Sequence, residues 1–144
     1  MNIVLVASEF NAPIPDRMLE VARRKAKALG ATVVDVVRVP GAWEVPPAVA
    51  RALARRDVDA VVAIGAIVKG ETKHDELIAA TVADALMHLQ LTRGKPVGLG
   101  ITGPGITWEQ AEARVDSAAR AVAAAVRGAR TRTRPRAARR PRSR

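Results

Sequence analysis

Residues 58–76 read VDAVVAIGAIVKGETKHDE, and this stretch decides the fold. Its first part, up to Gly65, is almost wholly apolar, which is typical of a β-strand covered on both faces. A helix is expected over residues 75–91, where Ile78 and Val82 recur on one face. A buried strand followed by an amphipathic helix is the repeating unit of a parallel sheet. The stretch therefore predicts a sheet of that kind.

The same unit recurs along the rest of the chain. Gly30 and Gly94 follow helical segments and are suited to end them, and Pro46 and Pro47 suit the first turn of a helix. Strands alternating with helices predict a parallel sheet with right-handed crossovers and helices on both faces. Ligands bind such sheets at the carboxyl ends of the strands. We expect the further strands over residues 2–7, 32–39 and 97–102, and the further helices over about 16–29, 45–56 and 107–127.

The composition excludes several classes of protein. The chain has 144 residues, which fits one domain with a single core, and it contains no cysteine. Disulfides, thiolate nucleophiles and thiolate metal sites are therefore excluded. The N-terminus has no basic region before its apolar run, and no apolar run approaches the ~18 residues of a membrane span. We expect a cytoplasmic protein.

The positive charge is concentrated at the C-terminal end. Residues 127–144 contain nine arginines and no acid; without them the 24 Lys and Arg fall to 15, against 14 Asp and Glu. We therefore expect one domain over residues 1–127 and a disordered Arg/Pro-rich tail over residues 128–144. Such a tail can bind nucleic acid through phosphates. A solvated extension is favoured, because no aromatic residues interleave the arginines.

Aromatic and ionisable residues follow the predicted strands. Phe10 comes after the first strand, Trp43 and Glu44 after the second, and His74 after the third. Phe10 and Trp43 are two of only three aromatic rings in the chain. Rings in such places can simply cover the ends of the core. Together with a carboxylate and an imidazole, they indicate a pocket for a flat polar ligand.

The turn Gly70–Glu71–Thr72 is a candidate phosphate site. It leads into the third helix, whose first turn offers free N–H groups and the positive end of the helix dipole. Thr72 can add its hydroxyl. The alternative is an ordinary helix cap formed by Thr72 with Asp75, and the two functions can coexist. His74 lies at the mouth of the same turn, where an imidazole can transfer protons near neutral pH.

Two further polar residues have simpler interpretations. His88 lies in the middle of a predicted helix without chemical neighbours, so we interpret it as structural. Arg114 is expected in the last helix, at the edge of its apolar face. It is either a surface arginine or a clamp for phosphate, including phosphate bound at a site on another subunit.

Four segments together resemble the lumazine synthase (6,7-dimethyl-8-ribityllumazine synthase) family, over residues 1–127. The resemblance implies a three-layer α/β/α sandwich with a four-stranded parallel sheet in the flavodoxin-like order 2-1-3-4. The run GETKHDE and the run GPG are similar to the archaeal branch of the family. The four segments are residues 9–11 (EFN), residues 40–46 (PGAWEVP), residues 65–74 with the pattern Gly-x-Thr-x-His, and residues 109–111 (EQA) followed by Arg114.

The resemblance also implies a reaction and a set of site residues. The family condenses 5-amino-6-(D-ribitylamino)uracil with 3,4-dihydroxy-2-butanone 4-phosphate, releasing phosphate and water, with no metal or organic cofactor. His74 would transfer protons, and Glu71, Thr72 and Arg114 would bind the phosphate. Leu99 and Arg114 would come from the neighbouring subunit of a homo-oligomer, either a pentamer or a shell of twelve pentamers. Contacts to the pyrimidine ring and the ribityl chain are implied for Phe10, Ala42, Trp43, Glu44, Ala66, Ile67, Val68 and Leu99.

Two other functions fit the same pattern. An archaeal-type riboflavin synthase would use the lumazine as its substrate, but that substrate carries no phosphate, so the phosphate turn disfavours it. A non-enzymatic mononucleotide-binding module predicts that His74 is dispensable. The chain also departs from the family at two positions. Trp43 stands where phenylalanine is common, and Leu99 stands where the residue is often aromatic. These differences are expected to affect the affinity for substrate more than the type of reaction.

Overall fold

Four parallel strands form one sheet in the order β2-β1-β3-β4. The computed structural model describes residues 1–70 and 72–133. The predicted fold class and strand order are confirmed. The elements are β1 (Asn2–Ser8), α1 (Pro13–Ala28), β2 (Thr32–Val39), the short 3₁₀ helix η1 (Ala42–Glu44), α2 (Val45–Leu53), β3 (Ala60–Val68), α3 (His74–Arg93), β4 (Val97–Ile106), α4 (Trp108–Ala113) and α5 (Ser117–Thr133).

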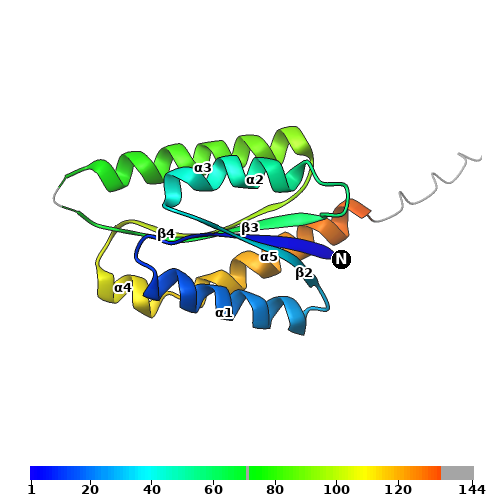
Figure 1. Ribbon diagram of the computed structural model, residues 1–144, viewed down its shortest axis with the longest axis horizontal. Coiled ribbons are helices and arrows are strands. Elements are labelled where there is room, and N and C mark those ends of the chain that lie inside the picture. The colour runs from blue at the N-terminus through cyan, green and yellow to red at the C-terminus, as the bar shows by residue number, and fades with distance from the viewer. Residues whose placement is uncertain (71, 134–144) are drawn as a thin grey trace, which may run out of the picture.

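Helices cover both faces of the sheet. In Figure 1, α2 and α3 lie over one face, and α1, α4 and α5 lie over the other. Successive residues of a strand point to opposite faces, so a strand between two helical layers must be apolar throughout. In β1, Ile3 and Leu5 belong to the core on the side of α1 and α5, whereas Val4 and Val6 belong to the core on the side of α2 and α3.

Two glycines let α5 approach the edge strand β4 closely. A Cβ atom at Gly98 would lie 2.5 Å from the carbonyl oxygen of Ala121 in α5. One at Gly100 would lie 3.3 Å from the Cβ atom of Ala121 and 2.8 Å from the carbonyl oxygen of Ala63 in β3. No side chain fits at such distances from backbone atoms. The glycines of β4 therefore fix how close the helical layer lies to the sheet.

Both β3 and β4 continue beyond the ends that the sequence pattern predicts. The pattern ends β3 near Gly65 and makes residues 103–105 a loop. In the structure Val68 still pairs with Ile106, and the N–H of Lys69 donates to the carbonyl of Ile106 at 2.7 Å. The register shifts between Ala66 and Val68, and this shift accommodates residues 103–105. Pairing between segments distant in sequence decides these strand ends.

The last helix differs most from its prediction. Two helices replace the one expected over residues 107–127, because the N–H groups of Arg114 and Ser117 donate to the carbonyls three residues earlier. α5 then continues to Thr133, beyond the predicted end at Arg127. Residues 134–144 of the predicted tail lie outside the described residues.

The other helices differ only at their ends. α1 begins at Pro13, before the predicted start near residue 16, and proline is well tolerated in a first helical turn. α2 ends at Leu53 rather than near Arg56. Across residues 1–70 and 72–133, none of the helices combines the length and the apolar character needed to cross a membrane.

Candidate active site

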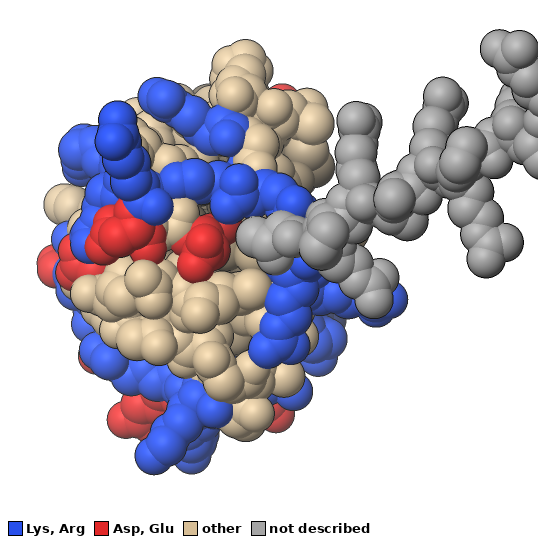
Figure 2. Space-filling view, turned by 90° about the vertical axis from the view of Figure 1, so that its right-hand side faces the viewer, with Lys and Arg blue, Asp and Glu red and all other residues tan. Residues whose placement is uncertain are grey.

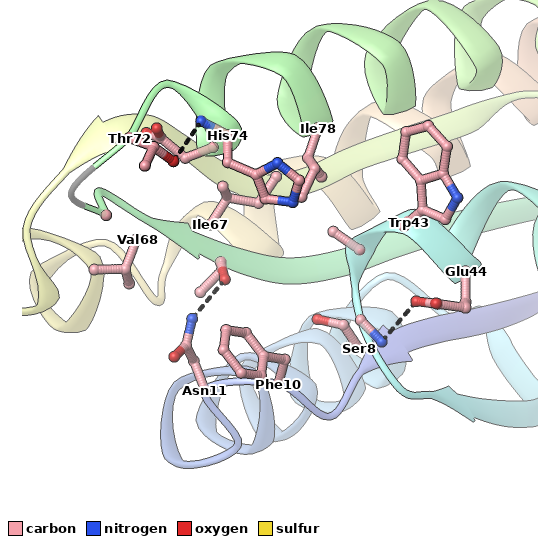
Figure 3. Close-up of a pocket in the computed structure, with 15 residues that line it drawn as sticks. Ser8, Phe10, Asn11, Trp43, Glu44, Ile67, Val68, Thr72, His74 and Ile78 are labelled. Atoms are coloured by element: carbon pink, nitrogen blue, oxygen red, sulfur yellow. Dashed lines mark hydrogen bonds between the residues drawn. The ribbon is translucent and has the colours of Figure 1, made fainter.

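A cavity of about 420 Å³ opens at the carboxyl ends of β1, β2 and β3. These ends meet at one edge of a parallel sheet, which brings together segments far apart in sequence (Figure 3). The volume of the cavity is typical of sites for small molecules. Of the residues predicted from the sequence, the cavity lining contains Phe10, Ala42, Trp43, Glu44, Ala66, Ile67, Val68, Thr72 and His74.

Phe10 and Asn11 enter the cavity from the end of β1. The N–H of Phe10 donates to the carbonyl of Pro40 at 2.9 Å, which ties this loop to the end of β2. The ring is left 71% exposed, an unusual state for the only phenylalanine of a chain. Asn11 adopts a left-handed backbone conformation with φ 62°, and its side-chain amide donates to the carbonyl of Ala66 at 3.0 Å.

The 3₁₀ helix η1 presents Trp43 and Glu44. The N–H of Gly41 donates to the Glu44 carboxylate at 3.0 Å, and the N–H of Glu44 donates back to the carbonyl of Gly41 at 3.1 Å. These reciprocal bonds fix the turn between β2 and α2. Trp43 is 56% exposed, so its indole ring is available to a ligand.

The end of β3 forms the floor of the cavity. Ala66 and Ile67 are buried, and Val68 is half-buried. Because β3 continues to Val68 and pairs there with Ile106 of β4, the backbone of this segment is held in place on one side. The amide of Asn11 holds it on the other side. The floor is therefore a rigid, largely apolar surface with peptide groups at its rim.

The turn before α3 contributes Thr72, His74 and Asp75. The Thr72 hydroxyl accepts from the backbone N–H of His74 at 3.3 Å. The predicted pairing of Thr72 with Asp75 is replaced by a different contact: the carboxylate of Asp75, only 8% exposed, accepts from the N–H of Gly105 at 3.1 Å. Asp75 thus joins the start of α3 to β4. Figure 3 shows the imidazole of His74 projecting from the start of α3 into the cavity.

Three predicted site residues are not found in this cavity. Glu71 lies outside the described residues. Leu99 is 57% exposed on β4 and lines a separate hollow of about 240 Å³ between β4 and α3. Arg114 is exposed and follows α4, at the break between α4 and α5 rather than within a continuous helix.

The cavity also contains residues that the sequence interpretation did not assign to ligand binding. Asn11 could have been identified, because asparagine is among the few residues that adopt a left-handed conformation readily. Asp75 gave only a capping signal, since its contact with Gly105 depends on the folded chain. The residues concerned are Ser8, Asn11, Gly41, Asp75 and Ile78, whereas Gly70, which also lines the cavity, belongs to the predicted phosphate turn.

The cavity combines apolar walls with few polar groups. Among the described residues, its ionisable side chains are those of Glu44, His74 and Asp75, which come from two different strand exits. Within the described ranges, no three His, Cys, Asp or Glu side chains are grouped so that they could hold a metal ion. Such a cavity suits a flat ligand that stacks on rings and forms hydrogen bonds at its edges.

The sheet, its two helical layers and this cavity define the chain as a flavodoxin-like α/β protein with a small-molecule site at the strand ends. Comparison with known proteins makes this specific. The sequence model of the 6,7-dimethyl-8-ribityllumazine synthase family matches residues 1–133. The chain belongs to this family.

Similar sequences come from archaea. The chain is 52% identical over 125 residues to the 6,7-dimethyl-8-ribityllumazine synthase of Staphylothermus marinus, covering 87% of this chain and 83% of the relative. It is 52% identical over 127 residues to that of Methanopyrus kandleri, covering 88% and 90%. It is 47% identical over 127 residues to that of Methanocaldococcus jannaschii, again covering 88% and 90%.

The function follows from this membership. The chain is a transferase of riboflavin biosynthesis that forms 6,7-dimethyl-8-ribityllumazine from two substrates. The family, the similarity to archaeal members and the activity predicted from the sequence are confirmed. The riboflavin synthase and the non-enzymatic binding module are set aside.

Proposed function

We propose that the cavity at the strand ends is where 5-amino-6-(D-ribitylamino)uracil and 3,4-dihydroxy-2-butanone 4-phosphate condense. One observation carries the proposal: the rings of Phe10 and Trp43, the carboxylate of Glu44 and the imidazole of His74 converge on one cavity from three strand ends. We place the reaction in the cytoplasm, because a chain without cysteine suits a reducing compartment.

The pyrimidine ring lies between Phe10 and the floor formed by residues 66–68. A ring that is 71% exposed at the mouth of an apolar cavity has a face free for stacking. The peptide groups at the rim of β3 then bind the polar edge of the pyrimidine. Asn11 positions this rim through its hydrogen bond to Ala66.

The ribityl chain extends toward Trp43 and Glu44, with Ala42 beside them. One oxygen of the Glu44 carboxylate accepts from Gly41 at 3.0 Å. A carboxylate has about four acceptor positions, so the other oxygen remains able to accept from ribityl hydroxyls. The bond to Gly41 orients the side chain before the substrate arrives.

The phosphate binds at the start of α3. The first-turn N–H groups of this 20-residue helix carry the positive end of the helix dipole, and Thr72 uses its hydroxyl for only one of them. We assign phosphate contacts to Thr72, to the backbone of Glu71 and to Arg114 of a neighbouring subunit.

His74 moves protons during the condensation. Attack of the substrate amine on the ketone carbon requires a proton to leave nitrogen and another to reach the oxygen that departs as water, and loss of phosphate requires a further proton shift. An imidazole can both accept and donate protons near neutral pH. Because the turn is held by the backbone N–H of His74 rather than by its ring, the imidazole remains free for this role. Holding two reactants together supplies the rest of the rate enhancement.

The complete site is shared between subunits. Leu99 and Arg114 do not line the cavity of their own chain, and both are exposed. α3 carries further exposed apolar side chains, Leu77, Met87 and Leu91, on a helix that is apolar around most of its circumference. We propose a homo-oligomer, a pentamer or a shell of twelve pentamers, in which Leu99 and Arg114 of one subunit complete the cavity of the next.

His74→Ala tests the catalytic assignment. We expect the rate of lumazine formation to fall about 10²–10⁴-fold at saturating substrates, the usual contribution of a general acid–base group, with little change in KM. His88→Ala is the matched control, because His88 is the only other histidine and lies exposed on the same helix. Both rates are followed by lumazine absorbance. Equal rates for the two variants would remove His74 from the mechanism.

Mixing two inactive variants tests the shared site. Subunits carrying His74→Ala and subunits carrying Arg114→Ala are co-assembled in equal amounts. If each cavity takes His74 from one chain and Arg114 from the next, about a quarter of the interfaces combine two intact residues, and activity returns to about that fraction. No recovery in a mixed oligomer whose assembly is verified by mass would show that each site is built within one chain.

A further inference from the structure

The end of the domain opposite the cavity is rich in lysine and arginine. Because α1, α2, α3 and α5 all follow strands of one parallel sheet, their C-terminal ends meet at this end. Figure 2 views the molecule from this side and shows basic side chains around its rim, with some acidic side chains among them and uncharged residues at its centre. Each of these helices has basic residues in its last turn or just beyond it, and α5 has one more a turn earlier. They are Lys25 and Lys27, Arg55 and Arg56, Arg93 and Lys95, and Arg127, Arg130 and Arg132.

Three acids near this end already have partners. Asp35 and Asp57 both accept from Arg55, each at 2.9 Å. The pKa of Asp57 is lowered, chiefly by its hydrogen bond from Arg55. Asp59 accepts from the backbone N–H of Asn2 at 2.7 Å. Arg55 thus balances much of the negative charge of these acids by itself, and the lysines and arginines named above outnumber the three acids.

The ordinary explanation for basic residues at helix ends is incomplete here. Cations in a last turn complement the helix dipole, but this effect is confined to that turn. Here the surplus of basic over acidic residues continues in the sequence beyond the last turn of α5. α5 ends at Thr133 on this same end of the domain, and the eleven residues 134–144 that follow it contain six arginines and no acid.

We propose that this surface binds nucleic acid through its phosphate backbone. We call it the basic end and define it by Arg56, Arg93, Arg127, Arg130 and Arg132. Closely spaced phosphates complement a cluster of cations drawn from several helices, and the release of their counterions drives binding. The sequence pattern alone favoured a solvated extension; the cations that the fold brings together from several helices change that preference.

The mode of binding follows from what the basic end contains. The aromatic rings of the chain are Phe10, Trp43 and Trp108, and all three lie at the carboxyl ends of the strands. Without rings there is no platform on which bases can stack. Binding is therefore independent of base sequence and strongly dependent on salt. It leaves the cavity at the other end of the domain accessible to substrates.

The experiment measures the affinity of the full chain for a fluorescein-labelled single-stranded RNA of mixed sequence by fluorescence anisotropy, over about 50–200 mM NaCl. One variant combines R56Q, R93Q and R132Q. Its matched control combines R17Q, R23Q and R120Q, which remove the same charge from exposed positions in the early and middle turns of α1 and α5. None of these six residues lines the cavity.

The parent chain and the control variant should show the same slope of log affinity against log salt. The slope of the R56Q/R93Q/R132Q variant should be shallower by about 2, because each lost phosphate contact on a single strand lowers it by about 0.7. Lumazine formation should be unchanged in both variants, which shows that they fold. Equal slopes for the two variants, or no binding to RNA at the lowest salt, would overturn the proposal. So would binding of the full chain to anionic phosphatidylglycerol vesicles but not to RNA.

Discussion

Asn11 offers a perturbation that separates backbone strain from hydrogen bonding in the site. Its φ of 62° places it in the left-handed region, and its amide donates to the carbonyl of Ala66 at 3.0 Å. Asn11→Gly keeps the backbone conformation at little steric cost but removes the amide. Asn11→Ala removes the amide and also forces a Cβ atom into the left-handed region.

The expected magnitudes differ between the two variants. Loss of one intramolecular hydrogen bond costs about 0.5–1.5 kcal/mol, and glycine adds a few tenths to about 1 kcal/mol through the entropy of the unfolded chain. Alanine avoids that entropy term but incurs about 1–2 kcal/mol for the left-handed conformation. We expect Asn11→Ala to be the less stable variant. A loss of 1 kcal/mol lowers the unfolding midpoint of a domain of this size by about 3–5 °C.

The two variants should affect substrate binding equally. Both release the carbonyl of Ala66 and loosen the end of β3, where we place the pyrimidine. If about 1 kcal/mol of the lost hydrogen-bond energy is lost from the free energy of substrate binding, KM for 5-amino-6-(D-ribitylamino)uracil rises about fivefold in each variant. KM for the phosphate substrate should change less, because that substrate binds near α3.

The assay combines steady-state kinetics with thermal unfolding at one fixed protein concentration, since oligomerisation makes the midpoint depend on concentration. An unchanged KM in both variants would refute the positioning role of Asn11. A variant Asn11→Ala that unfolds at or above the temperature of Asn11→Gly would refute the reasoning about the left-handed backbone.

Three further changes test other parts of the structure. Gly98→Ala should destabilise the fold by about 1–3 kcal/mol, because its Cβ would lie 2.5 Å from the carbonyl oxygen of Ala121; an unchanged urea midpoint would contradict the close approach of α5. Glu44→Gln can still accept from Gly41 but presents a donor in place of the second oxygen, so KM for the ribityl substrate should rise about tenfold or more with stability retained; an unchanged KM would exclude the ribityl contact. Leu91→Lys places a charge on a side chain that is 73% exposed on α3 and should lower the mass measured by sedimentation; an oligomer of unchanged mass would exclude this part of α3 from the interface.

Much of the fold could be predicted because its signals are local. The residues of β1 are apolar on both faces, so the continuous apolar run in the sequence already indicates a strand between two helical layers. Gly30 follows α1 with φ 73° and Gly94 caps α3 with φ 65°, both left-handed positions that suit glycine at a helix end. The capping box of Thr107 and Gln110 at the start of α4 is a short-range pattern of the same kind.

The predictions that failed depend on contacts between distant segments. The ends of β3 and β4 are decided by the pairing of Val68 with Ile106, and no local pattern encodes that pairing. The extension of α5 past Arg127 follows from tertiary packing, since Ala129 is fully buried in the core beneath the sheet. A run that appears basic and polar in sequence can therefore continue a helix when one of its small residues packs inward.

By itself, the sequence determined which residues stand at the strand ends, and hence that Phe10, Trp43, Glu44 and His74 share one edge of the sheet. Parallel connections bring all carboxyl ends together, so the order of elements was enough. The tertiary structure alone decided that Asp75 bonds to Gly105, that Leu99 and Arg114 do not line the cavity of their own chain, and that basic side chains of several helices lie at one end of the domain. These features depend on register and on the approach of separate layers, which the periodicity of a single segment does not contain.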